Sequence, residues 1–168
     1  MSGDVGLPDG FVLCALDSVA STNDEARGRA EAGASGGLVI TAREQTEGRG
    51  RYGRSWASPP GHLYASVLLR PDCAMAATTQ LSLLAGLALA GALEGLGPPG
   101  LDLKLKWPND VLIGGAKVAG LLLEGTARPD GRAAWVLVGS GINVASYPDG
   151  TPYPATSLRE AGFAEVAP

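Results

Sequence analysis

The sequence predicts an α+β fold built on a mixed, largely antiparallel β-sheet with helices packed on one face. Three observations support this fold class. The expected strands outnumber the expected helices, several consecutive strands are separated only by short turns, and the regular strand–helix alternation of a doubly wound sheet is missing. At 168 residues the chain is long enough for one domain with a hydrophobic core. We therefore expect residues 1–168 to form a single domain.

Seven segments have the apolar alternation or the β-branched content that is typical of strands. The glycines of Gly114-Gly115-Ala116 separate the fifth segment from the sixth and predict a tight hairpin. The expected strands are residues 11–16, 38–43, 63–69, 101–106, 111–113, 117–124 and 135–144.

A short helix is expected after the first strand. Thr22 and Glu25 have the spacing of a capping box, and residues 26–32 continue the helix until Gly33 can stop it. Helix capping is therefore the ordinary explanation for the polar side chains at the start of this segment.

A longer helix is expected over residues 76–93. The uncharged stretch that contains it has the length of a membrane span, but polar residues interrupt its first half and small residues fill its second. We expect a buried helix of a water-soluble protein.

The composition is that of a globular protein, with 45% hydrophobic and 18% charged residues. A net charge of −4 argues against general nucleic-acid binding, because such proteins usually carry a basic surplus. No basic segment followed by an apolar run is visible at the N-terminus, and the isolated Cys14 and Cys73 suit reduced thiols. We expect a cytoplasmic protein that binds neither nucleic acid nor a membrane.

The Gly/Arg loop, residues 48–56, holds a local cluster of positive charge. Gly48, Gly50 and Gly53 match the dinucleotide-binding spacing literally, but the chain then runs into Pro59 and Pro60 where that motif opens a helix. Glycines and guanidinium groups can instead wrap a small anion, while a solvated surface loop is the ordinary alternative.

The end of this loop favours a nucleotide over a bare anion. Trp56 follows Arg49, Arg51 and Arg54, and a large aromatic side chain beside phosphate-binding arginines suits an adenine base.

A second polar cluster follows the fourth expected strand. Turn chemistry explains Asn109 and Asp110, but it does not explain the charge of Lys106 at the end of an apolar strand. Lys117 opens the next hairpin strand, and a lysine whose stem lies along the apolar surface is the ordinary alternative there.

No nucleophile with a neighbouring base can be assembled, because His62 is the sole histidine and neither cysteine has a suitable partner. Activation of a carboxylate by ATP needs no such pair. The carboxylate of the substrate attacks the α-phosphate, and catalysis comes from alignment and from charge stabilisation.

Taken together, the motifs resemble the biotin protein ligase family, and the resemblance covers nearly the whole chain. The ordered set is more specific than any of its elements. It consists of Ser21-Thr22-Asn23, Gln45-Thr46-Glu47-Gly48-Arg49-Gly50-Arg51-Tyr52-Gly53-Arg54-Ser55-Trp56, Leu63-Tyr64-Ala65-Ser66, Lys106-Trp107-Pro108-Asn109-Asp110, Lys117-Val118-Ala119-Gly120, Gly139-Ser140-Gly141-Ile142-Asn143-Val144 and Ala155-Thr156-Ser157-Leu158.

The resemblance implies a fold like that of class II aminoacyl-tRNA synthetases and a ligase that activates biotin with ATP and Mg²⁺. The product, biotinyl-5′-AMP, would then donate biotin to a lysine of a biotin carboxyl carrier protein. Lys117 and Arg51 would be catalytic, and Asp110 is the candidate metal ligand. The implied biotin site comprises Ser21, Thr22, Asn23, Gln45, Gly48, Arg49, Arg51, Lys117, Gly120 and Gly139, and the implied ATP site comprises Arg51, Arg54, Trp56, Lys106, Asn109, Asp110 and Asn143.

The expected domain content differs from that of many family members. Neither the N-terminal helix-turn-helix domain nor the small C-terminal barrel of the family is expected within these residues. A lipoyl or octanoyl ligase, and a biotin-binding module with impaired catalysis, remain the alternatives. Whether the protein is a monomer or a homodimer stays open.

Overall fold

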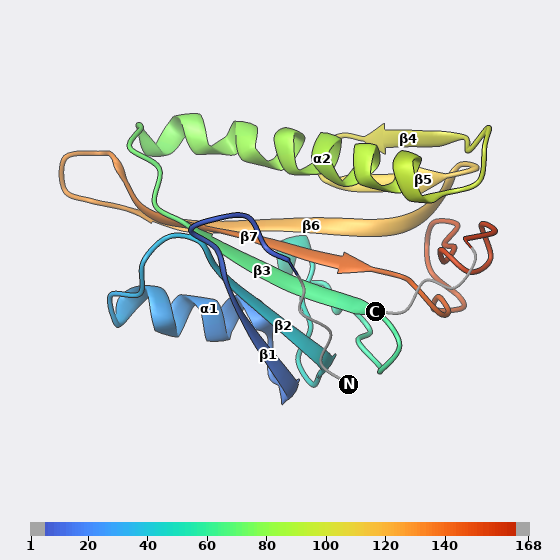
Figure 1. The fold of residues 1–168 in the computed structure, drawn as a ribbon, viewed down its shortest axis with the longest axis horizontal. Helices are drawn as coiled ribbons and strands as arrows, with labels where there is room; N and C mark the ends of the chain where they lie inside the picture. Colours follow the sequence, from blue (N-terminus) through green and yellow to red (C-terminus); the bar gives the residue numbers. More distant parts are fainter. Residues whose placement is uncertain (1–5, 164–168) are drawn as a thin grey trace.

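The computed structural model describes residues 6–163; residues 1–5 and 164–168, which the single-domain prediction also covers, lie outside this range. The described chain forms one seven-stranded sheet in the order β1-β2-β3-β7-β6-β5-β4 (Figure 1). Strands β1 and β2 are parallel and every other neighbouring pair is antiparallel, so the predicted mixed sheet is confirmed. The strands are β1 (Val12–Val19), β2 (Leu38–Gln45), β3 (Leu63–Leu69), β4 (Leu103–Lys106), β5 (Asp110–Ile113), β6 (Ala116–Ala127) and β7 (Ala133–Ile142).

All seven predicted strands are present, with shifts at their ends. The bounds of β3 agree with the prediction, whereas β1 and β2 continue further because their parallel pairing extends to Val19 and Gln45. The predicted hairpin joins β5 to β6. Gly114 and Gly115 have φ values of 57° and 81°, which suit the positive-φ turns that connect tightly paired strands.

The two helices lie on opposite faces of the sheet, which corrects the expectation that they share one face. Helix α1 (Thr22–Glu31) packs through Ala26 and Ala30 on Leu137 of β7. Helix α2 (Leu81–Leu96) packs on the cluster that contains Ile142 of the same strand. Residues 137 and 142 point to opposite sides of a strand because side chains alternate. Figure 1 accordingly shows α1 and α2 separated by the strands.

The predicted capping box at the start of α1 is wrong. Ser21, with φ −155° and ψ 137°, is the N-cap residue, and no side chain caps the helix there. Thr22 is already helical, and both its backbone N–H and its hydroxyl donate to Gln45 Oε1, at 2.9 and 3.1 Å. A tertiary contact with β2 has therefore replaced the local cap that the spacing suggests.

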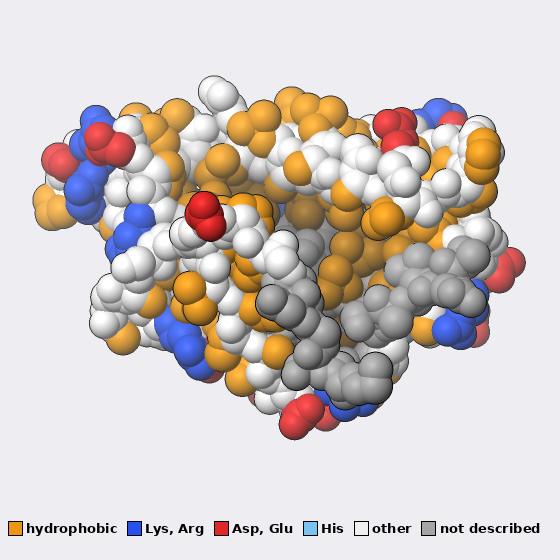
Figure 2. Space-filling model, viewed as in Figure 1, with side chains coloured by type: hydrophobic (Ala, Val, Ile, Leu, Met, Phe, Trp, Pro, Cys, Tyr) orange, Lys and Arg blue, Asp and Glu red, His pale blue; other side chains and the backbone are white. Residues whose placement is uncertain are grey.

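Helix α2 is not the buried helix that was expected. A short 3₁₀ helix, η2 (Met75–Gln80), precedes it, and only Gly86, Ala90 and Leu93 of α2 are buried. Apolar side chains gather over its outer surface (Figure 2), where Leu87 is 53% exposed. The segment Met75–Leu96 is long and apolar enough to cross a membrane, but a helix packed on a sheet passes the same test. Polar residues are scarce on both its faces, so the sequence alone does not show which face packs.

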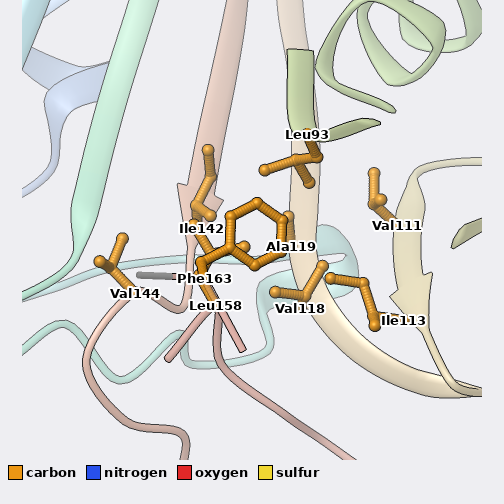
Figure 3. Packing of buried hydrophobic residues seen from close by; sticks show 9 residues of the cluster. All are labelled: Leu93, Val111, Ile113, Val118, Ala119, Ile142, Val144, Leu158 and Phe163. Atoms are coloured by element: carbon orange, nitrogen blue, oxygen red, sulfur yellow. The ribbon is translucent and has the colours of Figure 1, made fainter. Parts of the chain in front are cut away.

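The larger core cluster lies between α2 and the sheet. Figure 3 shows the Phe163 ring among side chains from β6, β7 and α2, including Ala119, Ile142 and Leu93. A Cβ at Gly97 would lie 2.7 Å from this ring, so the end of α2 fits closely over Phe163. The chain beyond β7 therefore returns to the core and closes this side of the domain.

Leucines on the two faces of α2 should differ sharply in their contribution to stability. Leu93 is 4% exposed, so Leu93→Ala should lower the free energy of unfolding by about 2–5 kcal/mol. Leu87→Ala, the matched control on the exposed face, should change it by less than about 0.5 kcal/mol. Urea unfolding followed by circular dichroism measures both. Equal losses in the two variants would contradict this assignment of faces.

Candidate active site

A cavity of about 560 Å³ lies on the α1 side of the sheet, between the start of α1, the Gly/Arg loop and strands β5, β6 and β7. This volume is within the range of small-molecule sites. Every predicted site residue except Gly48 lines it. These residues are Ser21, Thr22, Asn23, Gln45, Arg49, Arg51, Arg54, Trp56, Lys106, Asn109, Asp110, Lys117, Gly120, Gly139 and Asn143.

Gly48 does not line the cavity, but it allows the two sides of the Gly/Arg loop to pack closely. Its carbonyl accepts a hydrogen bond from the backbone N–H of Trp56 at 2.8 Å. A Cβ at this position would collide with Ser58 Oγ and with the carbonyl of Trp56. Only glycine therefore allows the two sides of the loop to come this close.

One end of the cavity is built from neutral hydrogen-bonding groups. Gln45 Oε1 accepts from Thr22, and Gln45 Nε2 donates to Ser58 Oγ at 2.9 Å. The Ser66 hydroxyl, which is fully buried, donates to Asn23 Oδ1 at 2.5 Å and lies 2.8 Å from Thr22 Oγ1. These bonds fix the side chains before any ligand arrives.

Asn23 connects this end of the cavity to β6. Its Nδ2 donates to Glu124 Oε2 at 2.8 Å, so the amide bridges two strands that lie on either side of β7. A Cβ at Gly139, on β7 between them, would overlap the Asn23 amide. The glycine at position 139 is therefore required by packing with α1, in addition to any contact with a ligand.

The Gly/Arg loop is a small hairpin. Arg49 and Ser55 form a bridge, and the N–H of Gly50 donates to the carbonyl of Arg54 at 2.7 Å. Tyr52 sits at its tip with φ 59° and an 84% exposed side chain. Arg51 contacts only this ring and its hydroxyl among the described side chains, at 4.9 Å from the ring centre and 3.1 Å from the oxygen.

Arg49, unlike Arg51, forms an ion pair with an acidic side chain. Both terminal nitrogens of its guanidinium group bond to the Asp24 carboxylate on α1, with 2.7 Å between Nη2 and Oδ1. The hydrogen bond to Asp24 raises the pKa of Arg49, and the same bond lowers the pKa of Asp24 against the opposing effect of burial. The sequence placed Arg49 toward biotin, whereas here its side chain is occupied by an ion pair at the edge of the cavity.

Trp56 lies across the floor of the cavity. A Cβ at Gly141 would be 2.6 Å from the indole Nε1, and one at Gly120 would be 3.2 Å from the ring edge. The indole therefore rests on bare backbone. Its Nε1 is buried against the Gly141 backbone and has no hydrogen-bond partner in the described structure. The role of Trp56 as an adenine platform stays a prediction.

Both lysines at the opposite end of the cavity have partners. Lys117 Nζ lies 2.7 Å from Asp110 Oδ1 and 5.1 Å from the centre of the Trp56 ring. Lys106 is exposed, and its Nζ lies 4.0 Å from the centre of the Tyr153 ring.

The two asparagines near these lysines hold the backbone in place. Asn109 Nδ2 donates to the carbonyl of Leu121 at 2.7 Å, and Asn143 Nδ2 donates to that of Thr156 at 3.0 Å. Their side-chain carbonyl oxygens remain as acceptors for a ligand.

Comparison with known proteins shows the family to which this chain belongs. A sequence profile of the biotin/lipoate A/B protein ligase family matches residues 15–143. The chain belongs to this ligase family. The biotin--[acetyl-CoA-carboxylase] ligase of Paracoccus denitrificans is 48% identical over 129 residues, which are 77% of this chain and 53% of that protein. The bifunctional ligase/repressor BirA of Bacillus spizizenii is 40% identical over 155 residues, or 89% of this chain and 47% of that protein.

Solved structures of the ligase family share the fold. The Aquifex aeolicus biotin protein ligase in complex with biotin and ATP is 38% identical, with a TM-score of 0.70 over 88% of this chain and 60% of that chain. The Leishmania major enzyme in complex with biotinyl-5-AMP is 31% identical, with a TM-score of 0.74 over 91% and 64%. The class II synthetase-like fold is thus confirmed, although this chain spans about half the length of the curated relatives.

The ligase-family cavity offers a metal ion one carboxylate. In residues 6–163 no group of three or more histidine, cysteine, aspartate or glutamate side chains could hold a metal by itself. Asp110 lines the cavity beside Lys117. A single carboxylate fits Mg²⁺ that arrives on substrate phosphates, because that ion commonly binds one or two carboxylates together with phosphate oxygens.

Sequence reasoning missed part of the cavity lining. The loop after β7 adds Pro148, Thr151, Pro152 and Tyr153 to the cavity wall, although nothing in its composition distinguishes it from an ordinary turn. Gly141 could have been found, because Gly139 and Gly141 are two residues apart and therefore face the same side of a strand.

His62 lies outside the cavity lining and supports the segment that follows Asn143. Val144 donates its backbone N–H to His62 Nδ1 at 3.1 Å, and Ser146 Oγ lies 3.2 Å from Nε2. The ring thus fixes the segment next to Asn143. This arrangement requires Nδ1 without a proton, and burial lowers the pKa of His62, which favours the neutral ring.

The domain should lose stability on mild acidification through His62. A histidine with a depressed folded-state pKa stabilises the fold above its unfolded pKa of about 6.5, and this contribution is lost as the pH falls toward the folded value. In His62→Asn, Asn Oδ1 keeps an acceptor for Val144 without titrating. Since His62 is the sole histidine, calorimetry from about pH 7 to about pH 5 should show a fall in Tm that is weaker in the variant. Parallel profiles would contradict this role.

Proposed function

We propose that this protein is a ligase that activates biotin with ATP to biotinyl-5′-AMP and transfers the biotin to a lysine of a biotin carboxyl carrier protein. One observation carries the proposal: a single cavity joins a neutral hydrogen-bonding end to a cationic end beside an indole ring. A cyclic urea with a short acyl chain and a nucleotide phosphate would together match this sequence of groups.

The neutral end suits the ureido ring of biotin. A cyclic urea presents one carbonyl acceptor and two N–H donors, and Ser21, Thr22 and Gln45 offer hydroxyl and amide groups for both. Lipoate and octanoate have no such groups in their rings or tails, so they could not use the hydrogen-bonding capacity that remains after the contacts of Thr22 and Gln45 with each other are made. The neutral end therefore favours biotin.

The cationic end suits the reacting carboxylate and phosphate. Arg51 and Arg54 reach the cavity from the loop, and Lys117 reaches it from β6. In the first step a biotin carboxylate oxygen attacks the α-phosphorus and pyrophosphate leaves. Fixed positive charges at this position stabilise the negative charge that develops on the phosphoryl oxygens.

The second step uses the mixed anhydride as an acyl donor. The acceptor amine attacks the biotinyl carbonyl carbon, AMP leaves with the bonding electrons, and the nitrogen loses a proton. Closure of the Gly/Arg loop over the adenylate would protect it from water until the acceptor lysine arrives. Three glycines among its nine residues make such a movement feasible.

Mg²⁺ would bind through Asp110 and the phosphate oxygens, where it supplies further positive charge. Asp110 is the ion-pair partner of Lys117, so the two groups share one place at the phosphate end of the site.

The relatives support the choice of substrates and partners. One solved relative is in complex with biotin and ATP, another with biotinyl-5-AMP, and a curated relative is named for acetyl-CoA carboxylase. We place the reaction in the cytoplasm, with the carrier domain of a biotin-dependent carboxylase as acceptor and with no role for nucleic acid. Monomer and homodimer both remain compatible with it.

Biotin-dependent exchange of labelled pyrophosphate into ATP tests the first step. Wild-type protein should catalyse exchange with biotin, and Lys117→Ala should reduce it by about 10²-fold or more because a charge at the transition state is lost. Lys104→Ala is the matched control, since Lys104 is 63% exposed, pairs with Asp102 and lies outside the cavity.

Other outcomes of this assay separate the alternatives. Exchange with lipoate or octanoate but not with biotin would replace the proposal by a lipoyl or octanoyl ligase. Biotin binding without exchange would identify a binding module. Exchange followed by biotin transfer to a purified carrier domain would establish the complete reaction.

A further inference from the structure

The three arginines of the Gly/Arg loop differ in their exposure and in their ion-pair partners. Arg51 and Arg54 lie at and after the tip of the hairpin, and Arg54 is exposed. Arg49 lies at the root, where both terminal nitrogens bond to Asp24 and where Nη2 is also 3.8 Å from Glu124 Oε1. Its side chain is only 33% exposed. Within residues 6–163, ion pairs therefore connect the root of the loop to the body of the protein, whereas the side chains at the tip form no such ion pair.

The acids that hold Arg49 are themselves held. Asp24 lies in the first turn of α1 and contacts Arg27 at 3.0 Å. Glu124, on β6, accepts from Arg27 at 2.8 Å and from Asn23 at 2.8 Å. Two carboxylates and two guanidinium groups thus form one network of balanced charge across α1, the loop and β6.

We propose that Asp24 and Glu124 are positioning residues, which fix the root of the Gly/Arg loop through Arg49 and so set where the loop stands over the cavity. Neither acid lines the 560 Å³ cavity, although Glu124 lines a neighbouring pocket beside the loop. Their effect on substrates rests on the function proposed above, whereas their effect on the loop does not.

Because the Gly/Arg loop connects the two ends of the cavity, a network that fixes the loop also sets the positions of the side chains at both ends. Arg49 directly follows Gly48. The preceding residues lead back along the chain to Gln45, at the neutral end of the cavity. Ahead of Arg49, the hairpin carries Arg51 to the cationic end and returns to Trp56 on the floor. A root that is fixed on α1 aligns these groups before the substrate binds, which lowers the ordering cost of binding.

Asp24→Asn removes the charge and keeps the shape of the side chain. In protein without ligand, it should raise the rate of tryptic cleavage after Arg51 and Arg54 about three- to fivefold, because cleavage follows the fraction of time that the loop is released. Glu124→Gln should act in the same direction. Mass spectrometry of the fragments locates the cuts.

Glu25→Gln is the matched control. It breaks the ion pair between Glu25 and Arg29, at 2.8 Å, on the same helix but away from the loop. This variant should leave the cleavage rate unchanged. Thermal unfolding of every variant checks that only the loop, and not the whole fold, has been released.

A double-mutant cycle with Arg49→Gln tests whether the acid acts through Arg49. The double variant Asp24→Asn with Arg49→Gln should be cut no faster than Arg49→Gln alone, since the interaction can be lost only once. Additive increases in the two changes would overturn the proposal. So would a cleavage rate in Asp24→Asn equal to that of wild type.

Steady-state kinetics adds the link to the reaction. Asp24→Asn should raise the KM for biotin about fivefold with kcat within twofold of wild type, as expected when binding order is lost and the reacting groups remain. A loss confined to kcat would overturn the positioning role. If wild-type protein shows no exchange activity, the proposed function fails, while the cleavage rates still decide whether the acids anchor the loop.

Discussion

The position of Asn23 is the constraint on which the site depends. Its amide accepts from Ser66 on β3 and donates to Glu124 on β6, so it presses the first turn of α1 onto the sheet. Gly139, on the strand between them, leaves the space that this amide fills. Because the helix begins there, Thr22 meets Gln45, and one end of the cavity takes its shape from contacts that are complete without a ligand.

Glycines, which have no side chain, shape the rest of the cavity floor. Gly120 on β6 pairs with Gly141 on β7, and together they expose backbone on which the Trp56 ring lies. A large flat ring can then border a deep site without leaving a void, since packing is close on one face and open on the other. The indole N–H is buried on the side of the ring that meets Gly141, and it has no partner in the described structure.

This acidic protein has a positively charged site because its cationic side chains differ in whether an acidic side chain pairs with them. Arg49 is neutralised by acids at the root of the loop, and Lys117 is paired with Asp110. Arg51, at the tip of the hairpin, has hydrogen-bond and cation–π contacts only with Tyr52 among the described side chains. The paired Arg49 holds the root of the loop in place, whereas the weakly held Arg51 would be available for an incoming phosphate. Lys117 would meet the same phosphate with Asp110 beside it.

The sequence by itself predicted the seven strands, because apolar alternation and turn glycines are local signals. It also named the residues that, apart from Gly48, line one cavity. Tertiary structure decided what depends on partners distant in sequence. Thr22 bonds to Gln45 instead of capping the helix, and Arg49, which was predicted to line the biotin site, forms an ion pair with Asp24 at the edge of the cavity. The faces of the helices were decided in the same way, since an apolar helix shows its packed side only when the strand register that receives it is known.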